Sequence, residues 1–81
     1  MKVKALNPRF EKYLKSHGLV KKFNKQIVLL CENPKHPSLR TELLEPKQMR
    51  VYSFRIDRKY RAIFGIVSRE IEIFDITDHY Q

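Results

Sequence analysis

Apolar and polar residues alternate one by one along the C-terminal half of the chain, which is typical of half-buried β-strands. Residues 51–56 place three apolar side chains on one face and two polar ones on the other: Tyr52, Phe54 and Ile56 against Ser53 and Arg55. A short polar connection follows at residues 57–59, where Asp57 suits the first position of a type I turn. Residues 60–67 then return as a second, more apolar strand. The pattern predicts a β-hairpin.

The two strands of this hairpin are expected to carry Arg55 and Arg61 side by side on the face away from the core. The core face of the second strand would hold Tyr60, Ala62, Phe64 and Ile66. Two guanidinium groups on an open sheet face form a candidate anion site, because each offers a planar fork of donors. Arginines on solvated sheet faces are also common, so alternation alone leaves a role as ordinary surface residues open.

The last strand, residues 70–77, changes the phase of its alternation between Ile73 and Phe74. Such a switch indicates either a β-bulge or burial of both faces. With a bulge, Phe74 and Ile76 are expected in the core. Asp75, Thr77 and His79 would then share the face of the two arginines.

The N-terminal half is predicted to form a short lysine-edged strand and a helical hairpin. Asn7 and Pro8 start the first helix as N-cap and first helical residue, and Gly18 ends it. Its apolar stripe is Phe10, Tyr13, Leu14 and His17. A second helix is expected over residues 19–32, with a stripe of Val20, Phe23, Ile27, Leu30 and Cys31, and with Lys21, Lys22, Lys25 and Gln26 outside it. Val28 and Leu29 widen its apolar surface, for the core or for a partner.

Residues 34–46 form an irregular connection that contains His36-Pro37 and ends at Pro46. Leu39, Leu43 and Leu44 need burial there, and we expect a short strand near residues 39–44. The whole chain, residues 1–81, is thus predicted to be one α+β domain: a short N-terminal strand, a helical hairpin and an antiparallel sheet, with the helices on one sheet face.

Charge is the strongest global property of the chain. It has 81 residues, with 17 Lys and Arg against 9 Asp and Glu, and a net charge of +8. Six basic residues and a single acid fall within residues 47–61. Such a field attracts polyanions, nucleic acid first, or an acidic protein. A single cysteine, Cys31, excludes an internal disulfide and fits a cytoplasmic protein, and the lack of a long apolar run predicts no membrane span.

Several segments together resemble the RelE/ParE toxin superfamily of bacterial toxin–antitoxin pairs. Residues 33–39, Asn-Pro-Lys-His-Pro-Ser-Leu, are similar to the family's segment after the second helix. Residues 52–56 and 60–64 are similar to its hairpin, with an aromatic residue, Arg-Ile and then Tyr-Arg. Residues 76–80, Ile-Thr-Asp-His-Tyr, resemble its closing element, especially in the YoeB-like branch. The resemblance covers nearly the whole chain.

The resemblance implies one of two activities. RelE-, YoeB- and HigB-like members are ribosome-dependent endoribonucleases that cut mRNA, whereas ParE-like members poison DNA gyrase. It also implies a cognate antitoxin that wraps the toxin, and a homodimer or a heterotetramer with that antitoxin. A degenerate module that only binds an antitoxin is a third possibility.

For the nuclease, the resemblance implies catalytic roles for four residues: Arg61, Arg55, His79 and Tyr80. Arg61 would stabilise the charged transition state, and His79 would be the general acid, with Tyr80 beside it. RNA-binding candidates are the basic residues around them: Arg40, Lys47, Arg50, Arg58 and Lys59. The family's general-base positions correspond to Pro37 and Ser53 here, so His36, Arg40 and Glu42 are the candidates for that role. No metal or other cofactor is expected, because the His, Cys and acidic residues lack metal-ligand spacing.

Overall fold

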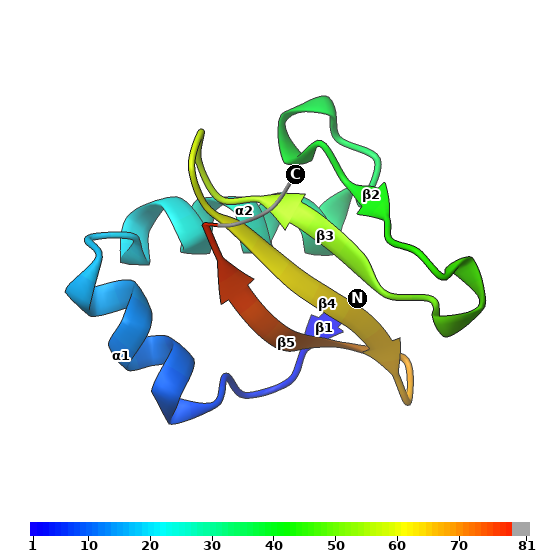
Figure 1. Cartoon of the computed structure of the whole chain (residues 1–81), viewed down its shortest axis with the longest axis horizontal. Coiled ribbons are helices and arrows are strands. Elements are labelled where there is room, and N and C mark those ends of the chain that lie inside the picture. Colours follow the sequence, from blue (N-terminus) through cyan, green and yellow to red (C-terminus); the bar gives the residue numbers. More distant parts are fainter. Residues whose placement is uncertain (79–81) are drawn as a thin grey trace.

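The computed structural model describes residues 1–78, in which two α-helices cover one face of a five-stranded sheet (Figure 1). The elements in chain order are β1 (Lys2–Val3), α1 (Pro8–Ser16), α2 (Val20–Glu32), the 3₁₀ turn η1 (Pro37–Leu39), β2 (Glu42–Leu43), the 3₁₀ turn η2 (Lys47–Met49), β3 (Tyr52–Arg55), β4 (Arg61–Val67) and β5 (Glu70–Thr77). The predicted α+β class and the order of elements are confirmed.

The sheet has the strand order β1-β5-β4-β3-β2. Neighbouring strands from β2 to β5 are antiparallel, whereas β1 pairs with β5 in parallel. The lysine-edged N-terminal strand is therefore confirmed as an edge. Lys4 secures it, because its backbone N–H donates to the carbonyl of Ile71 (2.8 Å) and its ammonium pairs with Glu72 (3.2 Å).

The helices begin and end where the local sequence signals predict. The Asn7 side chain accepts a hydrogen bond from the backbone N–H of Arg9 (3.0 Å), and Pro8 is the first residue of α1. Gly18 follows the end of α1 with φ +65°, a left-handed conformation that suits glycine. The tight hinge folds α2 back along the sheet, and α2 passes behind the strands in the view of Figure 1.

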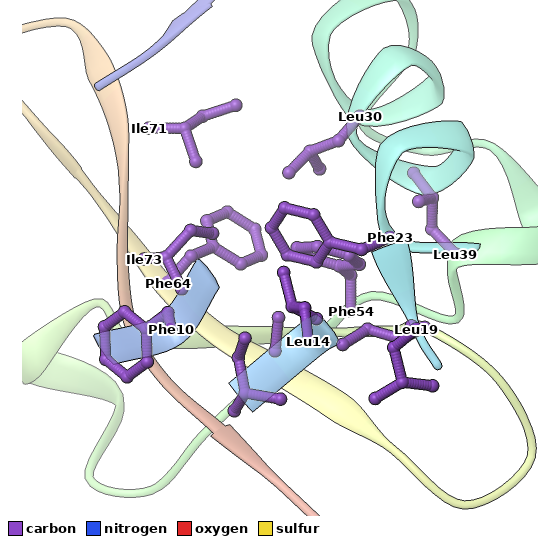
Figure 2. Packing of buried hydrophobic residues seen from close by; sticks show 13 residues of the cluster. Phe10, Leu14, Leu19, Phe23, Leu30, Leu39, Phe54, Phe64, Ile71 and Ile73 are labelled. Atoms are coloured by element: carbon purple, nitrogen blue, oxygen red, sulfur yellow. The ribbon is translucent and has the colours of Figure 1, made fainter. Parts of the chain in front are cut away.

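The core lies between the helices and the sheet. Three phenylalanines meet near its centre, Phe23 from α2 and Phe54 and Phe64 from the hairpin (Figure 2). Ring centroids are 6.0 Å apart for Phe23 and Phe54 and 5.7 Å apart for Phe54 and Phe64. Buried aliphatic residues from both layers surround these rings: Leu14, Leu19, Leu30, Leu39, Ile71, Ile73 and Ile76. Ile76 among them is the residue of the last strand that was predicted in the core and is found there.

The bulge predicted in β5 is present, but its effect on Phe74 differs from the prediction. Phe64 pairs with Ile73 and Ile63 pairs with Asp75, so Phe74 is the extra residue. Ile76 is buried as expected, whereas Phe74 is 37% exposed and lies against Gly65. The prediction of a core Phe74 was wrong, because the preceding Ile73 already fills the core position opposite Phe64.

Several other expected core positions are exposed. Val20, Leu43 and Ile66 are at least one-third accessible, because they lie at element ends that the facing layer does not cover. The strand predicted near residues 39–44 is confined to β2 and follows the 3₁₀ turn η1. Conversely, Gln26 was predicted outside the helical stripe and is instead buried, with 7% exposure.

Candidate functional site

Arg55 and Arg61 lie opposite each other at the turn end of the β3–β4 hairpin, as the alternation predicts. They are register partners, and Thr77 of β5 pairs with Arg61 from the other side. Strand alternation puts both side chains on the sheet face away from the helices, since Phe54 and Ala62, the next partners along the hairpin, are both fully buried in the core. The candidate site therefore contains two adjacent cations on one face of the sheet.

Arg61 is not the open surface arginine that the alternation suggested. Only 9% of it is exposed. Its Nε donates to the hydroxyl oxygen of Ser53 (3.0 Å), and its Nη2 donates to the backbone carbonyls of Arg40 and, more weakly, Ser53 (3.4 Å). The prediction of an open face at Arg61 was wrong, because the segment that includes Arg40 folds against it. The guanidinium is instead fixed in one orientation.

The electrostatic surroundings of Arg61 favour a bound anion. Burial lowers the pKa of the Arg61 guanidinium, the carboxylate of Glu42 raises it, and the like charges of Arg55 and Arg40 lower it. Arginine stays charged in proteins, so the lowered pKa means that its charge is partly stripped of water and repelled by two neighbours. A phosphate near Arg61 would relieve that repulsion.

Arg40 is positioned by the short turn η1. The imidazole Nδ1 of His36 accepts from the backbone N–H of Ser38 (3.2 Å), and the fully buried Leu39 anchors the turn in the core. Arg40 then adopts a left-handed backbone conformation with φ 45°, with its carbonyl toward Arg61. This residue, predicted to bind RNA, thus also holds the proposed catalytic arginine.

Of the three general-base candidates, Glu42 is the one that both lies near Arg61 and can accept a proton. It pairs in register with Ser53, whose hydroxyl holds Arg61, and its carboxylate acts on the pKa of Arg61. His36 instead lines a groove with Tyr52 and Phe64 on the helix side of the sheet. Arg40 cannot accept a proton, because its guanidinium is permanently charged.

The predicted RNA-binding residues divide between the two ends of the hairpin. Arg58 and Lys59 are exposed in the turn beside Arg55 and Arg61. Lys47 and Arg50 are exposed at the opposite end, where the carbonyl of Arg50 approaches Gly65. The structure therefore brings the turn pair and Arg40, but not Lys47 or Arg50, close to the two arginines.

His79 and Tyr80, the predicted general acid and its neighbour, lie outside the described residues. Among the described residues of β5, the last paired one is Thr77, opposite Arg61. Their catalytic roles stay predictions.

Gln26 is a positioning residue that sequence reasoning missed. Its side-chain amide donates to the backbone carbonyls of Ser38 (3.1 Å) and Arg55 (2.7 Å), which joins α2 to η1 and to the end of β3. The available signal was its spacing, because it stands three residues after Phe23 and four before Leu30 on the buried side of α2.

Asp57 shapes the turn that carries Arg58 and Lys59. Its carboxylate accepts from the backbone N–H groups of Lys59 and Tyr60, both at 2.9 Å, and from the ammonium of Lys22 (3.2 Å). Burial would raise the pKa of Asp57, but these hydrogen bonds and the Lys22 charge outweigh burial and leave it below its ordinary value. The predicted turn role of Asp57 is confirmed.

We expect Asp57 to make stability depend on pH in the acid range. Because its pKa is lower in the folded state, its contribution is complete above the unfolded pKa, about 3.9, and is lost as pH falls through the folded value. In Asp57→Asn, the amide oxygen can still accept both N–H bonds but has no charge. Urea unfolding from pH 7 to pH 2 should therefore show a shallower acid loss in this variant than in wild type. Equal slopes would contradict the prediction.

Among residues 1–78, no group of three or more His, Cys, Asp and Glu side chains is placed to hold a metal ion. In the same range, neither helix has the length and apolarity that a membrane span requires.

Comparison with known proteins identifies the fold. No protein-family model and no curated protein matches the sequence. Among solved structures, a YoeB/ParE toxin from Agrobacterium tumefaciens has a TM-score of 0.75 at 18% identity, over 99% of this chain and 100% of that one. The YoeB dimer from Staphylococcus aureus has a TM-score of 0.73 at 22% identity, over 98% and 94% of the chains.

A heterotetrameric YoeB–YefM toxin–antitoxin complex from Staphylococcus aureus is also similar. Its matching chain has a TM-score of 0.72 at 24% identity, over 99% of this chain and 100% of that one. These similarities extend over the whole domain and agree with the element order described above. The chain therefore has the fold of the YoeB/ParE toxins.

Proposed function

We propose that this chain is the toxin of a type II toxin–antitoxin pair and that it cleaves mRNA on the ribosome in the cytoplasm. The observation that carries the proposal is the pair of adjacent arginines, Arg55 and Arg61, on a fold shared with YoeB toxins. Arg61 is desolvated and fixed by Ser53 and Arg40. A fixed cation in a water-poor site stabilises developing negative charge more strongly than a solvated one.

The reaction uses the RNA's own 2′-hydroxyl as the nucleophile. The O2′–P bond forms and the P–O5′ bond breaks, which leaves a cyclic phosphate and a 5′-hydroxyl. Arg61, with Arg55 beside it, stabilises the extra negative charge on the phosphorus-bound oxygens in the transition state. The 2′ proton passes to the carboxylate of Glu42, and His79 gives a proton to O5′, with Tyr80 as its neighbour.

Glu42 as general base leads to a direct prediction. Glu42→Gln should lower the single-turnover rate of mRNA cleavage by about 100-fold or more, because general-base catalysis typically contributes that much. Folding should be unaffected, since Glu42 is exposed. Glu45→Gln, also exposed and three residues away, is the matched control. A Glu42→Gln protein that cleaves mRNA as fast as the Glu45→Gln control would exclude Glu42 from the role.

The function itself is tested with purified protein in a reconstituted translation reaction. Mapping the 5′ ends of the mRNA should show new cuts that require both the protein and translating ribosomes. Gyrase supercoiling is assayed in parallel. Inhibition of gyrase without mRNA cuts would favour the ParE-like alternative. If the protein neither cuts mRNA nor inhibits gyrase, a module that only binds an antitoxin is favoured.

The partner of this toxin is an antitoxin with an acidic, amphipathic segment. The net charge of +8 and an apolar groove of about 630 Å³ support this partner. Leu30, Tyr52, Phe64, Ile66 and Ile71 line the groove, and Lys35 and Arg40 add positive charge. The product of an adjacent small gene should co-purify with the toxin and silence it. The mass of the complex distinguishes a heterotetramer from a toxin homodimer.

A further inference from the structure

A second basic site lies at the edge of the sheet, apart from the contacts that hold Arg61. It is a hollow of about 460 Å³ between α2, η1 and the end of β3, here called the α2 hollow. The residues that matter for its chemistry are Lys22, Lys25, Gln26, Arg40, Arg55 and Asp57. Strand β2 pairs only with Tyr52 and Ser53, so in the described part of the chain the carbonyl of Arg55 at the β3 edge is bonded by the Gln26 side chain and not by a strand.

The charge of the α2 hollow is unbalanced. Among residues 1–78, four cations line it, and the one carboxylate is that of Asp57, already paired with Lys22 at 3.2 Å. Within residues 1–78, no carboxylate forms an ion pair with Lys25, Arg40 or Arg55. Like charges that converge without a counter-ion repel one another, and an anion among them would relieve the repulsion.

The α2 hollow is also fixed in shape. Gln26 is buried, and its amide is bonded to the carbonyls of both Ser38 and Arg55. The Nε of Arg55 donates to the carbonyl of Asp57 (3.2 Å), which orients the guanidinium. Little ordering of the backbone is therefore needed when a ligand binds, which favours affinity.

Two residues connect the α2 hollow to the Arg61 site. Arg40 lines the hollow and accepts from Arg61 with its carbonyl. Arg55 lines the hollow and is the register partner of Arg61. A ligand that engages both places must therefore carry regularly spaced negative charges along a flexible strand, as a single-stranded RNA backbone does.

We propose that the α2 hollow binds a backbone phosphate of the RNA strand, next to the phosphate held at Arg61. This inference rests on the proposed function, because it takes the strand at Arg61 to be RNA. A substitution of Lys25 tests this inference most directly. Its ammonium has no carboxylate partner among the described residues, whereas Lys22 also supports the Asp57 turn.

The test measures binding of a short labelled oligouridine by fluorescence anisotropy over a range of salt concentrations. Lys25→Gln should weaken binding several-fold at low salt and reduce the magnitude of the salt slope by about 0.7, the value for one phosphate contact on a single strand. Lys25→Arg should bind like wild type. Lys21→Gln is the matched control, because it removes the same charge from a neighbouring exposed position of α2 outside the hollow.

The outcomes separate this inference from the proposed function. Equal RNA affinities and salt slopes for Lys25→Gln and Lys21→Gln would overturn the inference, even if wild-type protein cuts mRNA. Selective loss of RNA binding in Lys25→Gln supports the hollow as an RNA site, even if no cleavage is found. The same titration with a polyglutamate peptide tests whether the hollow binds an acidic protein segment in place of RNA. A loss confined to the peptide would make the hollow a protein-binding site and overturn the inference.

Discussion

Arg61→Lys is expected to lower the rate of ribosome-dependent mRNA cleavage by at least about 100-fold, although the positive charge is kept. The loss of one fixed donor to a developing oxyanion typically costs 100- to 1,000-fold. Lysine is a point charge, so it cannot donate to Ser53 and Arg40 and also present a planar fork to a phosphate. Cleavage is measured under single-turnover conditions by primer extension on the mRNA.

The burial of Arg61 makes a stability measurement part of the same experiment. Either Arg61→Lys or Arg61→Ala leaves acceptors at Ser53 and Arg40 without their guanidinium donor, at about 1–3 kcal/mol for each buried unsatisfied group. Urea unfolding therefore has to accompany the kinetics, under conditions where each variant remains folded. Arg69→Lys is the matched control, since Arg69 is exposed in the β4–β5 turn at the other end of the sheet.

Ser53→Ala separates positioning from chemistry. It removes the hydroxyl that accepts from Nε of Arg61 but leaves the guanidinium itself. We expect a smaller fall in cleavage than for Arg61→Lys, since the Arg40 carbonyl still holds Nη2.

A folded Arg61→Lys protein with wild-type cleavage would show that the role of Arg61 is structural, and the nuclease mechanism proposed here would fail.

Much of the fold could be predicted because it depends on local rules. Strand alternation is strictly periodic, so the pairing of Arg55 with Arg61 on one face follows from the positions of Phe54 and Ala62. The first and last residues of a helix also depend on residues close in sequence. Asn7 caps the start of α1 and Gly18 follows its end, as their residue types predict.

The errors arise where distant segments meet. Residues 34–46 have no periodicity, so nothing local shows that Arg40 would fold against Arg61 and bury it. The burial of Gln26 likewise depends on two carbonyls that are 12 and 29 residues away along the chain. The change of phase in the sequence locates the bulge. It does not show which residue the bulge moves out of the core, and for that reason Phe74 was wrongly assigned to the core.

Three polar residues whose contacts depend on the folded chain lie close together in the structure. Gln26, Ser53 and Arg40 all contact the two arginines of the candidate site or the segments that carry them. A polar residue in a core-facing position is a local inconsistency, and such inconsistencies are expected at functional sites. The buried glutamine therefore links the stability of the domain to the geometry of the site.

Gln26→Leu is accordingly expected to lower the free energy of unfolding by about 2–6 kcal/mol. Leucine has a similar size but no donor, so the carbonyls of Ser38 and Arg55 lose a shared hydrogen-bond partner, at about 1–3 kcal/mol each. Urea unfolding measures the effect. Gln48→Leu makes the same exchange at an exposed position and should change stability by less than about 0.5 kcal/mol.

Because Gln26 joins α2 to η1, the same substitution should also impair the site. The turn η1 determines the position of the Arg40 carbonyl, which accepts from Arg61. Folded Gln26→Leu protein should therefore cut mRNA more slowly than wild type, while Gln48→Leu cuts normally. If Gln26→Leu is as stable as wild type, other groups must satisfy the two carbonyls. If it is unstable but fully active when folded, the position of Arg40 does not depend on this contact, and the proposed link between α2 and Arg61 is wrong.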